Sequence, residues 1–224
     1  MSRGYIVIAQ NNSTTDYLEQ AYALALNLKL TQSEVNNLTV CVDSKTKKLI
    51  KAKHKKVFDH IVDIPWQDDA KDAEWKINNK WKYYYMTRYD ETVILDTDML
   101  VLQDLENWWT FLKNYDLFFV SNVYTYRGEL ITSDHYRKTF TANSLPNLYA
   151  GFHYFKKCDF AKDFYAWLEL VMNNWEFFYG KYAKELYQKS LSVDLSAAIV
   201  AKILDCDKQI TNNKSYKYLV EKNN

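Results

Sequence analysis

Glycine is scarce in this chain, and its scarcity excludes two common types of nucleotide-binding loop. The 224 residues contain only four glycines, which lie far apart. A G-x-G-x-x-G dinucleotide turn needs closely spaced glycines, and a phosphate loop ends in G-K-[ST], so neither motif can be formed. If the chain binds a nucleotide, it therefore uses another type of site.

Cysteine and long apolar runs are also rare. The three cysteines, Cys41, Cys158 and Cys206, lack the paired spacing of zinc or redox sites, so we expect reduced thiols. The amino-terminal sequence MSRGYIVIAQNN has an apolar run of five residues, which is too short for a signal-peptide core or a membrane span. We therefore expect a cytoplasmic protein with no membrane span.

The charges of the chain nearly cancel, with a formal net charge of +1. This balance gives no reason to expect nucleic acid or an anionic membrane as a partner. The segment KTKKLIKAKHKK, residues 45–56, is a local exception. We interpret it as a solvated lysine-rich surface, and the alternative is a patch that binds a polyanion such as nucleic acid.

Apolar segments alternate with helical segments along the chain, and 48% of the residues are hydrophobic. This pattern predicts one domain of residues 1–224 with an α/β fold, in which helices flank a mainly parallel central sheet. Ligands bind such sheets at the carboxyl ends of the strands. Residues 122–144 are polar and aperiodic and are predicted to form a mobile flap. Strands are predicted at 5–10, 38–42, 60–64, 92–95, 116–121 and 147–155, and helices at 17–30, 79–88, 105–114, 161–175 and 194–204.

Aromatic residues make up 17% of the chain. We interpret clusters such as Tyr83-Tyr84-Tyr85 and Trp108-Trp109 as core residues, and the alternative is that they are platforms on which sugars stack.

Two aspartates interrupt an apolar run in the segment YDETVILDTDMLVLQDL, residues 89–105. Burying ionised carboxylates is costly unless a positive charge meets them. On an extended chain Asp96 and Asp98 face the same side, so both can bind one cation. Their oxygens prefer Mg²⁺ or Mn²⁺ to zinc. The alternative is that both are turn or cap residues after a strand.

The wider segment NKWKYYYMTRYDETVILDTDMLVLQDL resembles the donor-binding core of metal-dependent glycosyltransferases of the GT-A fold, and most closely the glycogenin-like family known as family eight. The matching features are a helical lysine (Lys80), a tyrosine (Tyr89), a short apolar strand, and the acidic pair Asp96 and Asp98. The resemblance implies a Rossmann-like GT-A fold, a Mn²⁺ or Mg²⁺ cofactor and a UDP-sugar donor.

The same resemblance implies roles for further residues. Lys80 would meet the diphosphate of the donor, and a solvated helix lysine is the alternative. Tyr17 would contact the nucleobase, and the alternative is that its ring packs on the sheet. The resemblance implies a nucleobase pocket of Ala9, Gln10, Asn11 and Tyr17. It also implies that Ala150 and Gly151 line the sugar pocket and that Asp194 is the catalytic residue in contact with the donor sugar.

The chain departs from the family pattern at three places. Tyr149 stands before Ala150-Gly151 where the family has asparagine, and Leu195 follows Asp194 where the family has glutamine. The family also closes its metal site with a carboxyl-terminal histidine, and no histidine follows His153. The third metal ligand is then water, phosphate or another side chain, or it is absent. We interpret His153 itself, in an apolar strand, as a core residue.

Together these features predict the transfer of a sugar from a nucleoside diphosphate to an acceptor that the sequence does not identify. The resemblance implies that the anomeric configuration is retained. The alternative is a catalytically degenerate protein of the same fold that binds a sugar nucleotide or a glycan without turnover.

Overall fold

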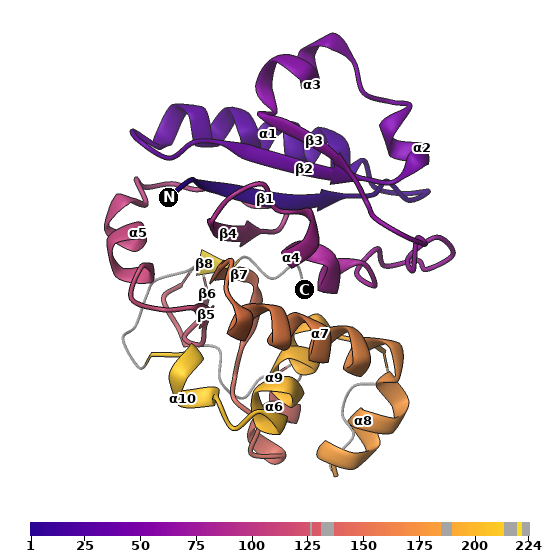
Figure 1. Cartoon of the computed structure of the whole chain (residues 1–224), viewed down its shortest axis with the longest axis vertical. Coiled ribbons are helices and arrows are strands. Elements are labelled where there is room, and N and C mark those ends of the chain that lie inside the picture. Colours follow the sequence, from indigo (N-terminus) through magenta and orange to yellow (C-terminus); the bar gives the residue numbers. More distant parts are fainter. Residues whose placement is uncertain (126, 131–136, 185–189, 213–218, 221–224) are drawn as a thin grey trace.

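The computed structural model describes residues 1–125, 127–130, 137–184, 190–212 and 219–220. Its centre is a six-stranded sheet of order β3-β2-β1-β4-β7-β5 (Figure 1). β7 runs antiparallel to both of its neighbours, and the other neighbouring pairs are parallel. The predicted α/β fold with a mainly parallel sheet is therefore confirmed. The strands are β1 (Arg3–Ala9), β2 (Leu38–Val42), β3 (His60–Asp63), β4 (Glu91–Leu95), β5 (Leu117–Val120) and β7 (Tyr149–Lys156).

Helices pack on both faces of this sheet. In Figure 1, α7, α8 and α9 gather at the opposite end of the molecule from α1, α2 and α3. Asp16 caps the first helix, since its side chain accepts a hydrogen bond from the backbone N of Glu19. The helices are α1 (Tyr17–Thr31), α2 (Ser44–Lys47), α3 (Ala52–Val57), the 3-10 helix η1 (Lys80–Lys82), α4 (Tyr83–Met86), α5 (Glu106–Leu112), α6 (Lys138–Ala142), α7 (Asp159–Asn173), α8 (Trp175–Tyr182), α9 (Val193–Ile203) and α10 (Asp207–Ile210).

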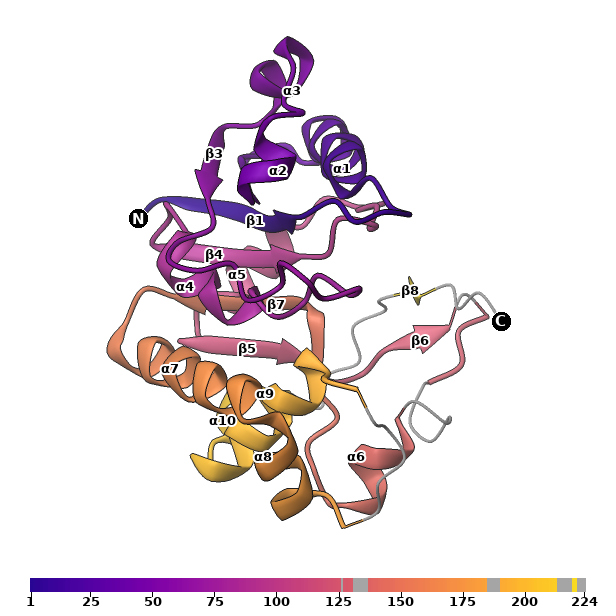
Figure 2. The ribbon, with the colours of Figure 1, turned by 90° about the vertical axis from the view of Figure 1, so that its right-hand side faces the viewer.

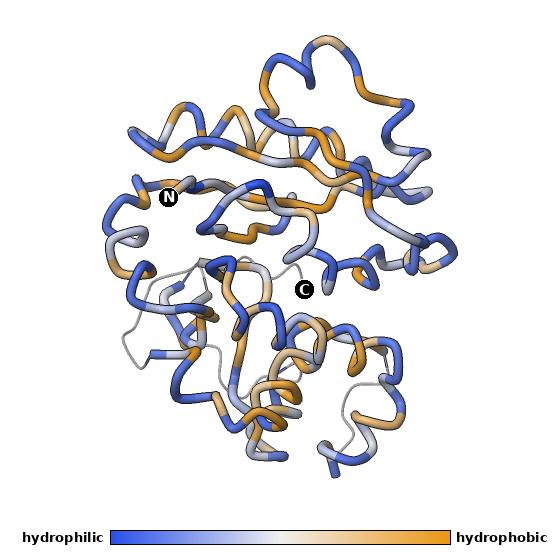
Figure 3. Tube along the Cα trace, viewed as in Figure 1, coloured by the Kyte–Doolittle hydropathy of each residue, from blue (hydrophilic) through white to orange (hydrophobic). Residues whose placement is uncertain are grey.

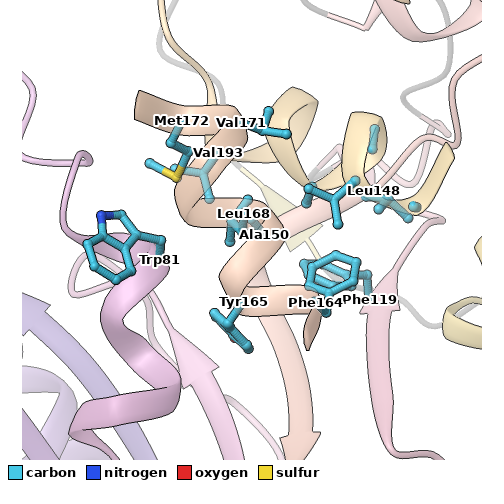
Figure 4. Close-up of a cluster of buried hydrophobic side chains, with 14 of the residues drawn as sticks. Trp81, Phe119, Leu148, Ala150, Phe164, Tyr165, Leu168, Val171, Met172 and Val193 are labelled. Carbon is cyan, nitrogen blue, oxygen red and sulfur yellow. The ribbon is translucent and has the colours of Figure 1, made fainter. Parts of the chain in front are cut away.

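The core consists of two layers, one on each face of the sheet. Along β1, Tyr5 and Val7 pack in the layer that contains α1, and Ile6 packs in the layer that contains α7 and α9. Because successive strand residues face opposite sides, a strand covered on both faces is continuously apolar. Figure 3 shows hydrophobic residues along the central strands. Figure 4 shows the second layer, in which Phe164, Leu168 and Met172 of α7 are grouped, with Trp81 beside them.

The aromatic clusters fall mostly in this core. Trp109 and Tyr83 are each 1% exposed, which confirms their interpretation as core residues. Tyr85 is 37% exposed, so the interpretation is wrong for this residue. Cys41 and Cys206 are buried free thiols, and Cys158 is a half-buried free thiol, as expected.

The stretch 122–144, predicted to be one mobile flap, contains ordered elements. Residues Tyr124–Thr125 form β6, which pairs with β8 (Leu219–Val220) apart from the main sheet (Figure 2). Phe140 of α6 is 1% exposed, so the prediction is wrong for this helix, which packs in the core. Residues 126 and 131–136 lie outside the described residues, and the flap stays a prediction for them.

The lysine-rich segment 45–56 forms most of α2 and α3, two short helices that the sequence pattern did not predict. Two of its lysines make surface ion pairs, Lys47 with Asp63 at 2.7 Å and Lys53 with Glu19 at 2.6 Å. Part of its positive charge is thus neutralised locally. In the part of the chain that the structure describes, no helix is both long and apolar enough to cross a membrane.

Candidate active site

Asp96 and Gly151 meet where β4 ends and β7 begins. The backbone N of Asp96 donates to the carbonyl oxygen of Gly151 at 3.2 Å. A Cβ atom added to Gly151 would lie 2.7 Å from Asp96 Oδ2 and 2.8 Å from Tyr149 Cε1. Since such approaches are too close for real Cβ atoms, only glycine at position 151 leaves room for the carboxylate as it lies here.

Asp98 follows in a turn and not in an extended chain. The expectation that Asp96 and Asp98 share one face of an extended segment is therefore wrong, because β4 ends at Leu95. The two carboxylates still interact. Partial desolvation, and then the negative charge of Asp96, raise the pKa of Asp98. A cation placed between them would relieve this repulsion.

Lys80, at the start of η1, points at the same acidic groups. Its Nζ lies 2.5 Å from Asp96 Oδ1, and its side chain is 18% exposed. Burial alone would lower the pKa of Lys80, but the charge and hydrogen bond of Asp96, and then the charges of Asp194 and Asp98, raise it. Lys80 is therefore kept charged beside three carboxylates, which does not fit the alternative of a solvated helix lysine.

Asp194 lies in the first turn of α9, buried against the start of β7. It does not open the helix as predicted, because Ser192 is the N-cap and accepts from the backbone N of Leu195. Asp194 Oδ1 accepts a hydrogen bond from the backbone N of Ala150 at 2.9 Å. Its Oδ2 accepts one from Arg137 Nη2 at 2.8 Å. The carboxylate is thus held beside the strand that carries Gly151.

Lys80, Asp96 and Asp194 line a cavity of about 360 Å³ at the carboxyl edge of the sheet, and Asp98 is not among its lining residues. Its wall combines charged groups with the exposed indole of Trp75, which is 66% exposed, and with Tyr149. The cavity has the mixed lining of a small-molecule site, with few polar groups that can orient a ligand. Of the residues predicted from the sequence, it brings together Lys80, Asp96, Ala150, Gly151 and Asp194.

The residues predicted for the nucleobase pocket lie at the end of β1 or after it, at the same edge of the sheet, but they do not line this cavity. Ala9 is fully buried at the end of β1, so it can offer only its backbone. The side chain of Asn11 accepts from the backbone N of Leu18 at 2.9 Å and donates to Asp16 at 2.8 Å. Asn11 therefore fixes the start of α1, whose first residue, Tyr17, is half-buried.

Gln10 is 1% exposed, and its amide is satisfied inside the protein. Its Nε2 lies 3.1 Å from both carboxylate oxygens of Asp68, and its Oε1 accepts from Asn79 Nδ2 at 2.7 Å. Asn79 also donates to Asp68 at 2.7 Å. Because Asn79 immediately precedes Lys80, this network ties the end of β1 to the segment that carries the lysine. Gln10 thus positions that segment.

The described residues fit a divalent cation that is held partly by protein and partly by substrate. Over the described ranges, no group of three or more His, Cys, Asp or Glu side chains could hold a metal ion. Asp96 and Asp98 then supply two carboxylates, and Mg²⁺ is commonly bound by one or two carboxylates together with substrate phosphates and water. Partial desolvation raises the pKa of Asp98, the charge of Asp96 raises it further, and a bound cation would oppose both effects.

His153 is not part of this set of ligands. It is 3% exposed, with Nδ1 lying 2.7 Å from the carbonyl oxygen of Ala150 and Nε2 lying 2.8 Å from the hydroxyl of Tyr165. Burial lowers its pKa to about 3, so the ring is neutral, with Nδ1–H donating and Nε2 accepting. Its interpretation as a satisfied core histidine is confirmed.

Two residues of the site were missed from the sequence. Arg137 falls in an aperiodic stretch, so no pattern pointed to its pairing with Asp194. Trp75 lies in a polar loop between β3 and η1, and only its large apolar side chain in such a loop could have drawn attention to it.

The fold is found in known glycosyltransferases. No protein-family model matches the chain, and no curated protein sequence does. The structure is similar to mouse xyloside xylosyltransferase 1 in its apo form, with a TM-score of 0.56 and 9% identity over 95% of this chain and 84% of that one. It is also similar to the galactosyltransferase LgtC, solved in complex with donor and acceptor sugar analogs, with a TM-score of 0.56 and 13% identity over 89% of this chain and 70% of that one. At such identities the likeness establishes the GT-A fold alone.

Proposed function

We propose that this chain is a metal-dependent glycosyltransferase that moves a sugar from a UDP-sugar to an acceptor. The observation that carries the proposal is the convergence of Lys80, Asp96 and Asp194 on one cavity at the carboxyl edge of a GT-A sheet. Ligands of α/β sheets bind at this edge. A lysine beside paired carboxylates suits a diphosphate that arrives together with its cation.

Asp96 and Asp98 would hold Mn²⁺ or Mg²⁺ together with the diphosphate of the donor. When bound, the ion supplies Lewis acidity that neutralises the charge developing on the departing diphosphate. Lys80 exchanges its contact with Asp96 for a phosphate oxygen and stabilises the same charge as a compact point charge. The free protein thus uses Lys80 to balance carboxylates that the donor and its cation balance in the complex.

Ala150, Gly151 and Asp194 bind the sugar of the donor. The backbone at Gly151 is accessible to a ligand because no side chain covers it. Asp194 contacts the sugar ring from beside Ala150, whose backbone N it accepts from, in an orientation fixed by Arg137. The nucleobase lies toward the end of β1, where Ala9 offers its backbone, Gln10 and Asn11 shape the pocket through their hydrogen bonds, and Tyr17 offers its ring.

The stereochemistry of the transfer is inferred from the sequence resemblance to the glycogenin-like family eight. This resemblance supports retention of the anomeric configuration. The acceptor enters the cavity past Trp75, whose exposed indole offers a flat apolar surface to a second sugar ring.

A second candidate is a degenerate protein that binds the donor without turnover. It is favoured by the engagement of both Asp194 oxygens and by Tyr149 in the sugar pocket. Release of UDP from UDP-sugars with Mn²⁺ and no acceptor distinguishes the two. We expect slow hydrolysis that Asp98→Asn abolishes. Donor binding without any hydrolysis would favour the degenerate protein, and absence of both would exclude the proposed function.

A further inference from the structure

A second cavity, of about 400 Å³, lies behind η1 and takes no part in the proposed reaction. It opens between the loop that follows β3 and the carboxyl-terminal half of α7, and aromatic and polar side chains line it. The two cavities flank η1, since Lys80 lines the first and Trp81 and Lys82 line the second.

Three aromatic rings form one wall of the second cavity. Trp66 and Trp81 are nearly parallel, with an interplanar angle of 8° and centroids 5.6 Å apart. Tyr85 stands edge-on to Trp66, at 74° and 5.1 Å. Trp81 is 5% exposed and forms the base of the wall, whereas Trp66 is 66% exposed and offers its ring to solvent. A flat apolar face of this size in water is typical of a binding surface.

The backbone of Trp66 is strained. Its φ is 61°, in the left-handed region, and bulky residues rarely adopt this conformation. Holding such a residue there is unfavourable, so the surrounding structure must fix it. Strain of this kind gathers at ligand-binding positions, where the gain is a side chain presented in one place.

Buried polar contacts hold the loop that carries Trp66. Asp69 Oδ2 accepts from Trp81 Nε1 at 3.1 Å and lies 3.1 Å from Lys82 Nζ. The carbonyl oxygen of Gln67 accepts from the same ammonium at 2.5 Å. The side chain of Lys82 is 0% exposed, so this anchor is built into the core and keeps the cavity formed without a ligand.

The polar groups opposite the rings come from α7. Glu169 and Asn173 line the cavity, and within the described part of the chain neither side chain has a hydrogen-bond or ion-pair partner. They offer acceptors together with an amide donor, a set that suits hydroxyl groups, which donate and accept. The acidic side chains Asp69 and Glu169 outnumber the one lysine, which disfavours an anionic ligand.

A cationic ligand is also disfavoured. Rings lined by carboxylates can bind ammonium groups, but Lys82 already places a positive charge beside the base of this wall, which would repel a second one. Lys82 Nζ lies 5.1 Å from the centroid of the Trp81 ring. A neutral ligand with apolar ring faces and many hydroxyls fits both the rings and the polar groups.

We propose that this cavity is a second carbohydrate subsite that binds a neutral hexopyranose oligosaccharide, one ring of which stacks on Trp66. Glu169 and Asn173 bind its hydroxyl groups. The subsite holds an acceptor glycan at a distance from the reacting end, and only this role as an acceptor site rests on the proposed function. Binding itself needs neither UDP-sugar nor metal.

Calorimetry with cellohexaose, maltohexaose and mannohexaose, without nucleotide or metal, tests the subsite. We expect at least one of these neutral hexaoses to bind. Trp66→Gly removes the ring and fits a φ of 61°, so the fold should be kept while affinity falls about tenfold. Glu169→Ala should weaken binding on the other wall. Phe177→Ala removes an aromatic residue of similar exposure, 64%, on α8, and should bind like the wild type.

Three results would overturn the subsite: no binding of any hexaose, equal binding by Trp66→Gly, or displacement of the bound hexaose by choline or a heparin oligosaccharide. UDP-sugar binding is measured on the same samples. If hexaoses bind and UDP-sugars do not, the proposed function fails while the subsite stands. If UDP-sugars bind and hexaoses do not, the subsite fails alone.

Discussion

Arg137 links Asp194 to the start of β7 through one guanidinium group. Its Nη2 lies 2.8 Å from Asp194 Oδ2, and its Nη1 donates to the carbonyl oxygen of Leu148 at 2.7 Å. The two side chains are only 3% and 11% exposed. The planar fork of arginine can make both contacts at once, which a lysine cannot. The orientation of the candidate catalytic residue therefore depends on a residue far from it in sequence.

We predict that Arg137→Met lowers the free energy of unfolding by about 3 kcal/mol, because it leaves the Asp194 carboxylate buried without its ionic partner. Urea denaturation would measure the change. The double variant Arg137→Met with Asp194→Asn should lose less stability than the single one, since the neutral amide tolerates burial better. Equal losses in the two variants would mean that the ion pair is not the cause.

Asp98→Asn should separate stability from donor binding. The pKa of Asp98 is raised by desolvation and by Asp96, so ionising this carboxyl costs more in the folded state than in the unfolded chain. The amide removes that repulsion, and the free energy of unfolding without metal should stay equal or rise slightly. Calorimetric binding of UDP-sugar with Mn²⁺ should be lost. Asp72→Asn, an exposed change outside the cavity, is the control. A variant that binds like the wild type would make Asp98 a turn residue only.

Lys80→Ala is predicted to weaken UDP-sugar binding by about tenfold while the protein stays folded, because an ionic contact to phosphate is lost. Calorimetry at two ionic strengths would show this loss together with a weaker salt dependence. Lys47→Ala removes a lysine that pairs with Asp63 on the surface and serves as the control. Unchanged donor affinity would mean that Lys80 neutralises the charge of Asp96 and does not bind the donor.

Gly151→Ala is expected to displace the Asp96 carboxylate, since the new Cβ would lie 2.7 Å from Oδ2. Metal-dependent donor binding should fall by about tenfold or more. Gly180→Ala is the matched control, because a Cβ there meets nothing within 4 Å. It lies within α8, where alanine should stabilise the protein by about 0.5–1 kcal/mol. Normal donor binding by Gly151→Ala would show that binding does not require the Asp96 carboxylate to lie against β7.

His153 predicts a pH dependence of stability. Its pKa is about 3 in the folded protein against an ordinary value of 6.5, so between these values only the unfolded chain binds the proton. The free energy of unfolding therefore falls as the pH drops below about 6.5, by about 2 kcal/mol at pH 5 from this group. The difference between the wild type and His153→Gln should shrink by that amount from pH 7 to pH 5. A constant difference would contradict the buried neutral ring.

The sequence predicted the strands of the sheet well because their apolar runs record burial on both faces. The local sequence was enough to predict β1, β2 and β4. The acidic pair after β4 indicated the edge of the sheet where ligands bind. The short helices α2 and α3 were missed because a run of lysines has no apolar periodicity. α6 was missed because it is one short turn of helix fixed by packing, with Phe140 as its buried residue.

The site was predictable only where its residues adjoin strands. Asp96 and Gly151 follow or begin strands, and the strand order brings them together. The burial of Gln10 and the hydrogen bonds of Asn11 at the start of α1 depend on partners elsewhere in the chain, so a resemblance that placed both at a nucleobase could not anticipate them. Arg137 and Trp66 take their places through tertiary contacts and a strained backbone, for which no local signal exists.

The antiparallel insertion of β7 has a consequence for how the molecule is made. Asp96 leaves the ribosome long before Tyr149, so the nascent chain carries the acidic turn beside an unpaired β4 edge until residues of β7 arrive to cover it. Closing the sheet and completing the pocket are then the same late event, because the backbone of Gly151 forms both. A chain that stops before Tyr149 would hold both aspartates and Lys80 but have no site.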